Sequence, residues 1–208
     1  MSQIPAPLLN RHTAIAVVVF SLLGVAAAVA TLVIPIEGSV LWLVVVRQIV
    51  LGVQMVVVAL AVFLIWRTLV GHSRGVTLAA LAAIGGLLLF ALVQLATIVV
   101  ATPWGVLPVV IGLELVALLA AVLMIGGMLG LGIAIIRQGA WRGPTKVTLI
   151  VAALLVIPLV LAQVVHLPLA IPYAIWSLSF LGLSVGLRTR RTIPVSGIPD
   201  SQLGAARV

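Results

Sequence analysis

Six apolar runs, each long enough to cross a lipid bilayer as a helix, occupy most of this chain. A membrane-spanning helix needs about 20 mostly apolar residues, because each residue advances the helix by about 1.5 Å and the hydrocarbon core is about 30 Å thick. The pattern therefore predicts an all-α fold, a polytopic bundle of six transmembrane helices. The expected spans are 13–34, 40–66, 76–101, 106–136, 147–165 and 168–187.

The composition is typical of a protein whose solvent is lipid. Of the 208 residues, 64% are hydrophobic and 7% are charged, whereas a soluble domain has about 25% charged residues. There is no cysteine, which excludes disulfides, thiolate metal sites and thiol nucleophiles within the chain. We expect one transmembrane domain over residues 1–191. The tail 192–208 has few apolar residues and is predicted to be disordered.

Lysine and arginine lie in alternate gaps between the apolar runs. The basic residues outside the spans are Arg11, Arg67, Arg74, Arg137, Arg142, Lys146, Arg188, Arg190, Arg191 and Arg207. Because cytoplasmic loops retain such residues, both termini are predicted to lie in the cytoplasm. The preference for arginine over lysine suggests a GC-rich bacterial genome, so the expected location is the bacterial cytoplasmic (inner) membrane. This topology explains the net charge of +8, and no nucleic-acid partner is expected because aromatic residues do not interleave with the basic ones.

Five spans carry polar side chains in the half nearer to the predicted outer face. Arg47 and Glu114 lie about seven and eight residues inside the outer ends of their spans, roughly 10 and 12 Å deep. Charged groups at such depths usually face the interior of a helix bundle. The candidate ligand-binding residues are Arg47, Gln94, Glu114, Gln163, Tyr173 and Trp176.

Two opposite charges at one depth have three interpretations. Arg47 and Glu114 could line an outward-opening polar cavity and bind or gate a ligand. They could instead form a buried ion pair that fixes how the second and fourth helices pack, although desolvation offsets much of such a pair's attraction. Arg47 could also extend its long side chain to the outer headgroups. The sequence does not separate these three.

Some other polar residues lie on the same helix face as a candidate residue, judging from their spacing in the sequence. Arg47 and Gln54 are seven residues apart and share a face of the second helix. Tyr173, Ser177 and Ser184 form one polar stripe on the sixth. These stripes are consistent with a ligand site and with helix packing.

Two glycine motifs invite a catalytic interpretation that their context does not favour. Residues 182–186 match G-x-S-x-G, but that nucleophile motif works where a strand turns sharply into a helix. Here it lies in an apolar helical run, where Gly182 and Gly186 form a G-x-x-x-G step for close helix packing. Gly126 and Gly130 form a second such step in the fourth span. We therefore interpret both as packing motifs.

The residues that membrane enzymes commonly use are missing from the spans. His12, His72 and His166 lie at or outside span ends, where none can hold haem within the bilayer, and Asp200 is the single aspartate. The chain has neither an H-E-x-x-H zinc signature nor a phosphate-binding glycine loop. We therefore expect no metal and no cofactor, and these absences count against most recognisable classes of membrane enzyme.

The last third of the chain has a pattern of its own. It contains Trp-Arg-Gly-Pro at 141–144, a short apolar span and Ile-Pro-Tyr-Ala-Ile-Trp at 171–176. This part resembles a family of uncharacterised six-span bacterial integral membrane proteins, in which an acidic residue often follows the tryptophan. This chain has Ser177 at that position. The resemblance implies six spans and no established activity.

Three functions remain as hypotheses. The first is the binding or passage of a small or amphipathic molecule through an outward-facing polar pocket. The second is an accessory or scaffold subunit that docks another membrane protein, or a second copy of itself, through its glycine seams. The third is a lipid-modifying enzyme. Membrane lipids are expected partners in each case.

Overall fold

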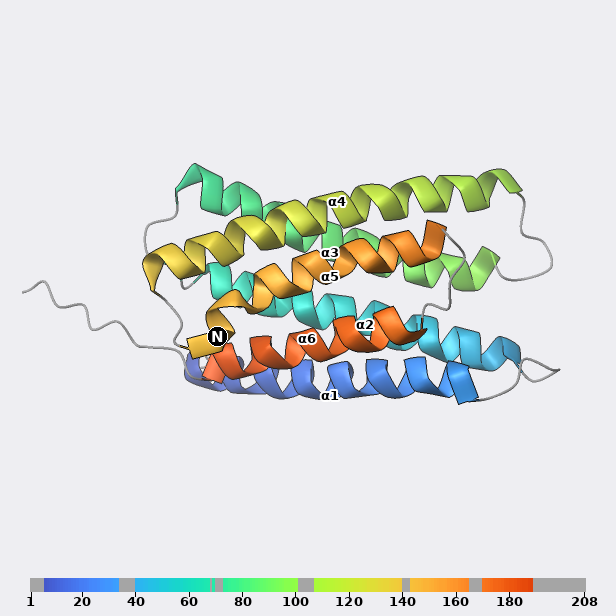
Figure 1. The fold of residues 1–208 in the computed structure, drawn as a ribbon, viewed down its shortest axis with the longest axis horizontal. Coiled ribbons are helices and arrows are strands. Elements are labelled where there is room, and N and C mark those ends of the chain that lie inside the picture. The colour runs from blue at the N-terminus through green and yellow to red at the C-terminus, as the bar shows by residue number, and fades with distance from the viewer. Residues whose placement is uncertain are drawn as a thin grey trace, which may run out of the picture.

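The chain folds into helices throughout the part that its structure, a computed structural model, describes. The described residues are 6–33, 40–67, 69, 73–100, 107–139, 143–164 and 170–188. The elements within them are α1 (Ala6–Val33), α2 (Val40–Trp66), α3 (Arg74–Val100), α4 (Leu107–Gln138), the short 3-10 helix η1 (Gly143–Val147), α5 (Thr148–Val164) and α6 (Ala170–Arg188). The all-α fold is confirmed, and each predicted apolar run forms one helix (Figure 1). The predicted tail 192–208 lies outside the described residues.

The residues that begin α3 and end α4 can be identified from their hydrogen bonds and backbone conformation. The backbone N–H of Val76 donates to Ser73 Oγ at 3.3 Å, so Ser73 caps the first turn of α3. Gly139 follows α4 with a φ of 60°, and its N–H donates to the carbonyl of Ile136 at 3.2 Å. Only glycine adopts that left-handed conformation at low cost, so Gly139 ends α4.

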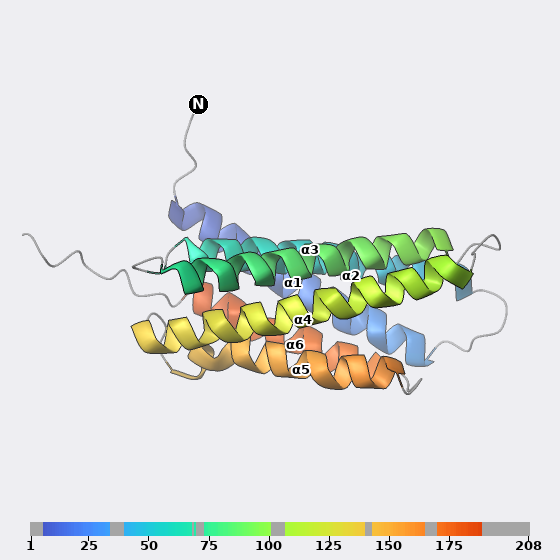
Figure 2. The ribbon, with the colours of Figure 1, turned by 90° about the horizontal axis from the view of Figure 1, so that it is seen from above.

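The six helices form a closed ring in chain order. Each helix packs on the next one along the chain, and α6 returns to pack on α1. The contacts of α3 with α4 and of α1 with α6 are the most extensive, and α6 also touches α2 across the ring. Figures 1 and 2 show the helices running roughly parallel to one long axis in alternating directions. This order decides which polar side chains can meet.

Four helices are long and apolar enough to cross a membrane. Their apolar stretches are Arg11–Ala30, Val45–Trp66, Arg74–Ile98 and Gly112–Gln138. The corresponding stretches of α5 and α6 are shorter, Thr145–Leu161 and Ile171–Leu187. Outward-facing leucines such as Leu78, Leu92 and Leu115 are each more than 60% exposed, a surface that lipid covers favourably. These properties indicate a membrane-embedded protein.

The two ends of the bundle differ in charge. At one end α2 and α4 finish and α1 and α3 begin; we call it the basic end. The exposed basic side chains described there are Arg11, Arg67, Arg74, Arg137 and Lys146. At the opposite end, called the Arg47 end, α2 and α4 begin. There α5 ends and α6 begins well short of the ends of α2 and α4 (Figure 1).

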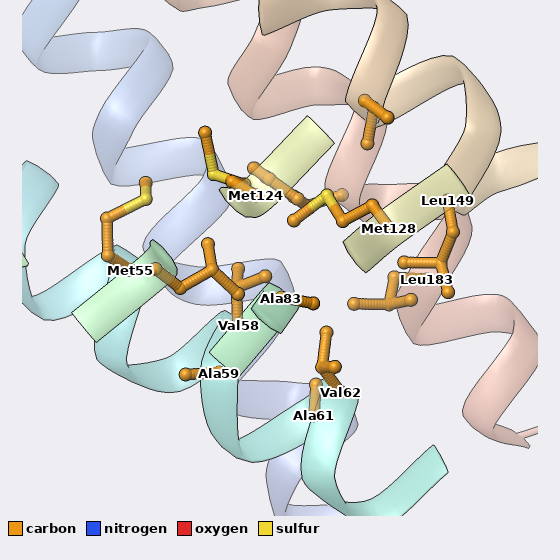
Figure 3. Packing of buried hydrophobic residues seen from close by; sticks show 14 of the residues in the cluster. Met55, Val58, Ala59, Ala61, Val62, Ala83, Met124, Met128, Leu149 and Leu183 are labelled. Atoms are coloured by element: carbon orange, nitrogen blue, oxygen red, sulfur yellow. The ribbon is translucent and has the colours of Figure 1, made fainter. Parts of the chain in front are cut away.

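The middle of the ring is filled by apolar side chains. Met55 and Val58 of α2, Met124 and Met128 of α4, and Leu183 of α6 are at most 1% exposed. Figure 3 shows side chains from α2, α3, α4, α5 and α6 converging at this level. Methionine adapts its shape to gaps between helices, and the interior is close-packed here.

Small residues on the facing sides of α3 and α4 allow the two helices to approach closely. The glycines of α4 that make this contact are not both the ones predicted from the sequence. A Cβ added to Gly86 would lie 2.6 Å from the backbone nitrogen of Met124, and one added to Gly127 would overlap the backbone of Ala83. Gly130 lies against Ala79 in the same way. Gly126 is exposed, with no atom within 4 Å of a Cβ there. The predicted Gly126–Gly130 packing step is therefore wrong in register, because Gly126 lies on the outward face of α4.

The G-x-S-x-G segment is part of an uninterrupted helix. α6 is helical from Ala170 to Arg188, so no strand-to-helix turn holds Ser184. The Ser184 hydroxyl donates to the carbonyl of Leu181 in the preceding turn at 2.7 Å. A Cβ on Gly182 would lie 2.6 Å from Thr148 Oγ1, so this glycine lets α6 approach the start of α5. The packing interpretation holds for Gly182.

Candidate functional site

Buried polar side chains gather in the ring interior from the middle of the bundle to the Arg47 end. We call this set the polar cluster. It consists of Ser21 of α1, Arg47, Gln48 and Gln54 of α2, Gln94 of α3, and Tyr173 and Ser177 of α6. Gln54, Gln94, Tyr173, Ser21 and Ser177 are each at most 6% exposed. Arg47 and Gln48 are half-buried.

The outer part of the cluster links α3 to α6 beside Arg47. Gln94 Nε2 donates a hydrogen bond to the Tyr173 hydroxyl at 3.4 Å. Arg47 Nε is buried and has no hydrogen-bond partner within the described residues, and the Arg47 charge acts electrostatically on the Tyr173 hydroxyl. The structure thus brings together three of the six residues predicted from the sequence, Arg47, Gln94 and Tyr173. Arg47 faces the interior rather than the lipid.

The deeper part of the cluster joins α2 to α6 across the ring. Ser177 Oγ donates to Gln54 Oε1 at 3.3 Å. Gly24 of α1 makes room for this pair, since a Cβ there would lie 2.5 Å from Gln54 Oε1 and 2.8 Å from Ser177 Oγ. Three helices therefore meet at one buried hydrogen bond, and a larger residue at position 24 would require the Gln54 and Ser177 side chains to shift.

Four polar atoms of the cluster have no hydrogen-bond partner within the described residues. They are Ser21 Oγ, Arg47 Nε, Gln48 Oε1 and Gln54 Nε2. Leaving a buried polar group unpaired costs about 1–3 kcal/mol. Most buried polar atoms in proteins are paired, so these four atoms are free to hydrogen-bond to water or to a bound molecule.

An aromatic layer lies directly beneath Gln94 and Tyr173. Trp176 is fully buried, and its ring centroid lies 4.8 Å from that of Phe180 and 6.5 Å from that of Phe90, both edge-to-face. The Trp176 indole N–H donates to the carbonyl of Ala152 at 3.1 Å. Trp176 was predicted as a possible wall of the site. It forms part of the site's apolar floor and ties α6 to α5.

Glu114 does not join Arg47. It is exposed on α4, and α4 packs on α3 and α5 whereas α2 packs on α1 and α3. Within the described residues no ion pair links Glu114 to Arg47, whose Nε is unpartnered. The interpretation of a buried Arg47–Glu114 pair is therefore wrong. The two residues were matched by depth along their helices, but α3 separates the helices that carry them.

Gln163 lies in α5, and its side chain falls outside the description. The list of predicted site residues missed Gln54 and Ser177. Helical phase was the available signal, because Gln54 shares a face with Arg47 and Ser177 shares one with Tyr173. Ser21 and Gln48 gave no such signal, because neither lies three, four or seven residues from another polar side chain.

The metal-binding potential of the described side chains is low. Among them, no group of three or more histidine, cysteine, aspartate or glutamate residues lies together. His12 is exposed at the basic end, while His72, His166 and Asp200 lie outside the described residues. The polar cluster contains amide, hydroxyl and guanidinium groups, which bind by hydrogen bonding and charge.

Comparison with known proteins finds no matching family model, curated protein or solved structure. The resemblance of the last third to six-span bacterial membrane proteins stays a prediction.

Proposed function

We propose that this protein is a six-span protein of the bacterial cytoplasmic membrane that binds a small or amphipathic molecule at the polar cluster, without catalysing a reaction on it. The supporting observation is the convergence of Arg47, Gln94 and Tyr173 from three helices, next to unpaired polar atoms. Pockets that hold small molecules are mostly apolar with a few convergent polar groups. The polar cluster, with the aromatic residues that lie beside it, has that composition.

Binding is favoured over passage by the packing of the interior. Between the aromatic layer and the basic end, the ring is filled by side chains such as Met55, Met124, Met128 and Leu131, all at most 1% exposed. A polar molecule crossing this region would lose its hydrogen bonds to water without replacement, a cost of several kcal/mol for each group (about 2–7). Passage would therefore require the helices to move apart.

Native mass spectrometry of the protein released from a mild detergent tests the binding function. We expect a small molecule to remain bound at unit stoichiometry, and to be lost from the Arg47→Gln variant. Arg74→Gln is the matched control, because Arg74 is exposed at the basic end. A second polypeptide at fixed stoichiometry, with no small molecule, would contradict the proposal and favour the scaffold alternative. A lipid whose mass changes on incubation with the protein would favour the lipid-modifying alternative.

We further propose that the basic end faces the cytoplasm and the Arg47 end faces outward. The gathering of described basic side chains at one end supports this, because lysine and arginine are enriched in cytoplasmic loops. Both termini are then cytoplasmic, and Arg47, Gln94 and Tyr173 lie in the half of the bundle nearer to the outer face. The proposed site would thus be reached from outside the cell or from the outer leaflet.

Single-cysteine labelling checks this orientation, since the chain has no native cysteine. A membrane-impermeant maleimide is expected to label Ser39→Cys, between α1 and α2, in intact cells. It is expected to label Ser73→Cys, just before α3, only after the membrane is permeabilised. The opposite pattern would reverse the orientation, and labelling of both positions in intact cells would contradict a single membrane span, α2, between them.

A further inference from the structure

The polar cluster carries a positive charge that no described carboxylate neutralises. The chain has three acidic residues, and of these Glu114 alone lies within the described residues, exposed on α4. Arg47 is half-buried and points into the ring. A charged side chain within a membrane span is energetically costly unless a partner compensates its charge. An anion beside Arg47 would supply that compensation.

Two groups in the outer part of the cluster are able to donate a hydrogen bond to a bound anion. The Tyr173 oxygen accepts a hydrogen bond from Gln94 Nε2, which leaves the hydroxyl hydrogen of Tyr173 free to donate. Arg47 Nε, a donor that cannot accept, is buried and unpartnered within the described residues. Gln94 thus acts as a positioning residue that turns the tyrosine hydroxyl toward an acceptor. Gln48 Oε1 is the unpaired acceptor on the same stretch of α2.

We propose that the molecule bound at the polar cluster carries a compact anionic group, a carboxylate or a phosphate, held by Arg47 and by the Tyr173 hydroxyl. This inference rests on the proposed binding function and names its ligand class. The planar guanidinium matches the geometry of both anions and binds them with two parallel hydrogen bonds. The aromatic layer of Phe90, Trp176 and Phe180 lies on the inner side of Gln94 and Tyr173, so an anionic group held by Tyr173 stays in the outer part of the cluster.

The same recognition could serve a free anion or the headgroup of an amphipathic molecule. The apolar floor and the lipid-exposed surface give an alkyl chain a favourable environment, whereas a free anion would need only Arg47 and Tyr173. Three probes separate these sources: inorganic phosphate, octyl phosphate and octanol. Octyl phosphate carries both the anion and the chain, and each of the others carries one of them.

The experiment titrates each probe into the purified full-length protein in dodecyl maltoside and measures its affinity by calorimetry. We expect octyl phosphate to bind at least tenfold more tightly than octanol. Arg47→Gln should weaken octyl phosphate binding tenfold or more, since a hydrogen bond to a charged group contributes about 1.5–3 kcal/mol and about 1.4 kcal/mol is a factor of ten. Octanol binding should not change. Arg74→Gln, which removes the same charge at the basic end, should leave both affinities unaltered.

Two conservative variants keep the test decisive if Arg47→Gln fails to fold. Arg47→Lys keeps the charge but loses the paired hydrogen bonds, and should bind octyl phosphate more weakly than the native protein. Tyr173→Phe removes only the hydroxyl, and should weaken octyl phosphate without affecting octanol. Competition by inorganic phosphate would identify a free-anion site, and its absence would identify an amphipathic ligand. Both results are consistent with the inference.

Other outcomes would overturn the inference, and they differ from those that defeat the proposed function. One such outcome is that octanol and octyl phosphate bind with equal affinity, and that neither affinity changes in the Arg47 variants or in Tyr173→Phe. This result would be consistent with the binding function but would reject the anionic group. An equal loss in Arg74→Gln would show that binding reflects net charge and not this site. Failure of all three probes to bind the folded protein would reject both proposals.

Discussion

Replacing Gly127 with alanine is expected to destabilise the bundle strongly. A Cβ at this position would overlap the backbone of Ala83 and lie 2.6 Å from the carbonyl oxygen of Ala79. Backbone atoms cannot move aside as a flexible side chain can, so α3 and α4 would have to separate. Overpacking of this kind costs about 1–3 kcal/mol and occasionally more. We expect the midpoint of thermal unfolding in detergent, followed by circular dichroism, to fall by several degrees or more.

Gly126→Ala is the matched control, one residue away on the same helix. A Cβ on Gly126 has no atom within 4 Å, and alanine favours a helix over glycine by about 1 kcal/mol. This variant should be as stable as the native protein or slightly more stable. If the two variants lost equal stability, the α3–α4 seam would not be placed as described. If Gly127→Ala were neutral, the close approach of the two backbones would be contradicted.

Replacing Trp176 with alanine is expected to have the second large effect. The indole is fully buried, packs edge-to-face on Phe180 and Phe90, and donates to the carbonyl of Ala152. Removing a buried aromatic side chain from a packed core costs about 3–5 kcal/mol. Because Trp176 contacts α3 and α5 as well as its own helix, its loss should loosen the ring as a whole. Thermal unfolding in detergent measures this loss.

Trp176→Phe distinguishes a structural role from a role in binding. Phenylalanine keeps an aromatic ring beside Phe180 but cannot donate to Ala152, so we expect a smaller loss of stability than for alanine. Ligand binding should survive in the folded phenylalanine variant, because the anionic group is assigned to Arg47 and Tyr173. A folded Trp176→Phe protein that no longer binds ligand would show that the indole contacts the ligand directly.

The helices themselves were predictable because the signal for a membrane helix is local. The predicted run 40–66 matches α2, and the others agree with their helices to within about two residues at each end. The exception is α1, which begins at Ala6 although its apolar run was predicted to begin at 13. The length of an apolar run predicts which residues lie within the lipid. It does not predict where the helix itself begins, because polar residues such as Asn10 and Arg11 also form helices.

The sequence did not predict which helices pack against each other or which face of each helix points inward. The outward faces of α3 and α4 carry leucines as apolar as those inside, since lipid and protein interior favour the same residues. Hydropathy therefore does not mark which face turns inward. That is why Gly126 was chosen as a packing residue when Gly127 takes that role, and why Arg47 and Glu114 were matched by depth alone.

The sequence by itself determined the helices, their apolar lengths and the confinement of most basic residues to one end, because each of these depends on residues close together in the chain. Only the tertiary structure decided that α3 stands between Arg47 and Glu114, that Gln94 reaches Tyr173, and that Gly24 lies against Gln54 and Ser177. These contacts depend on the order of helices around the ring and on the rotation of each helix about its axis. Both are fixed by the fit of side chains between helices, which no local stretch of sequence contains.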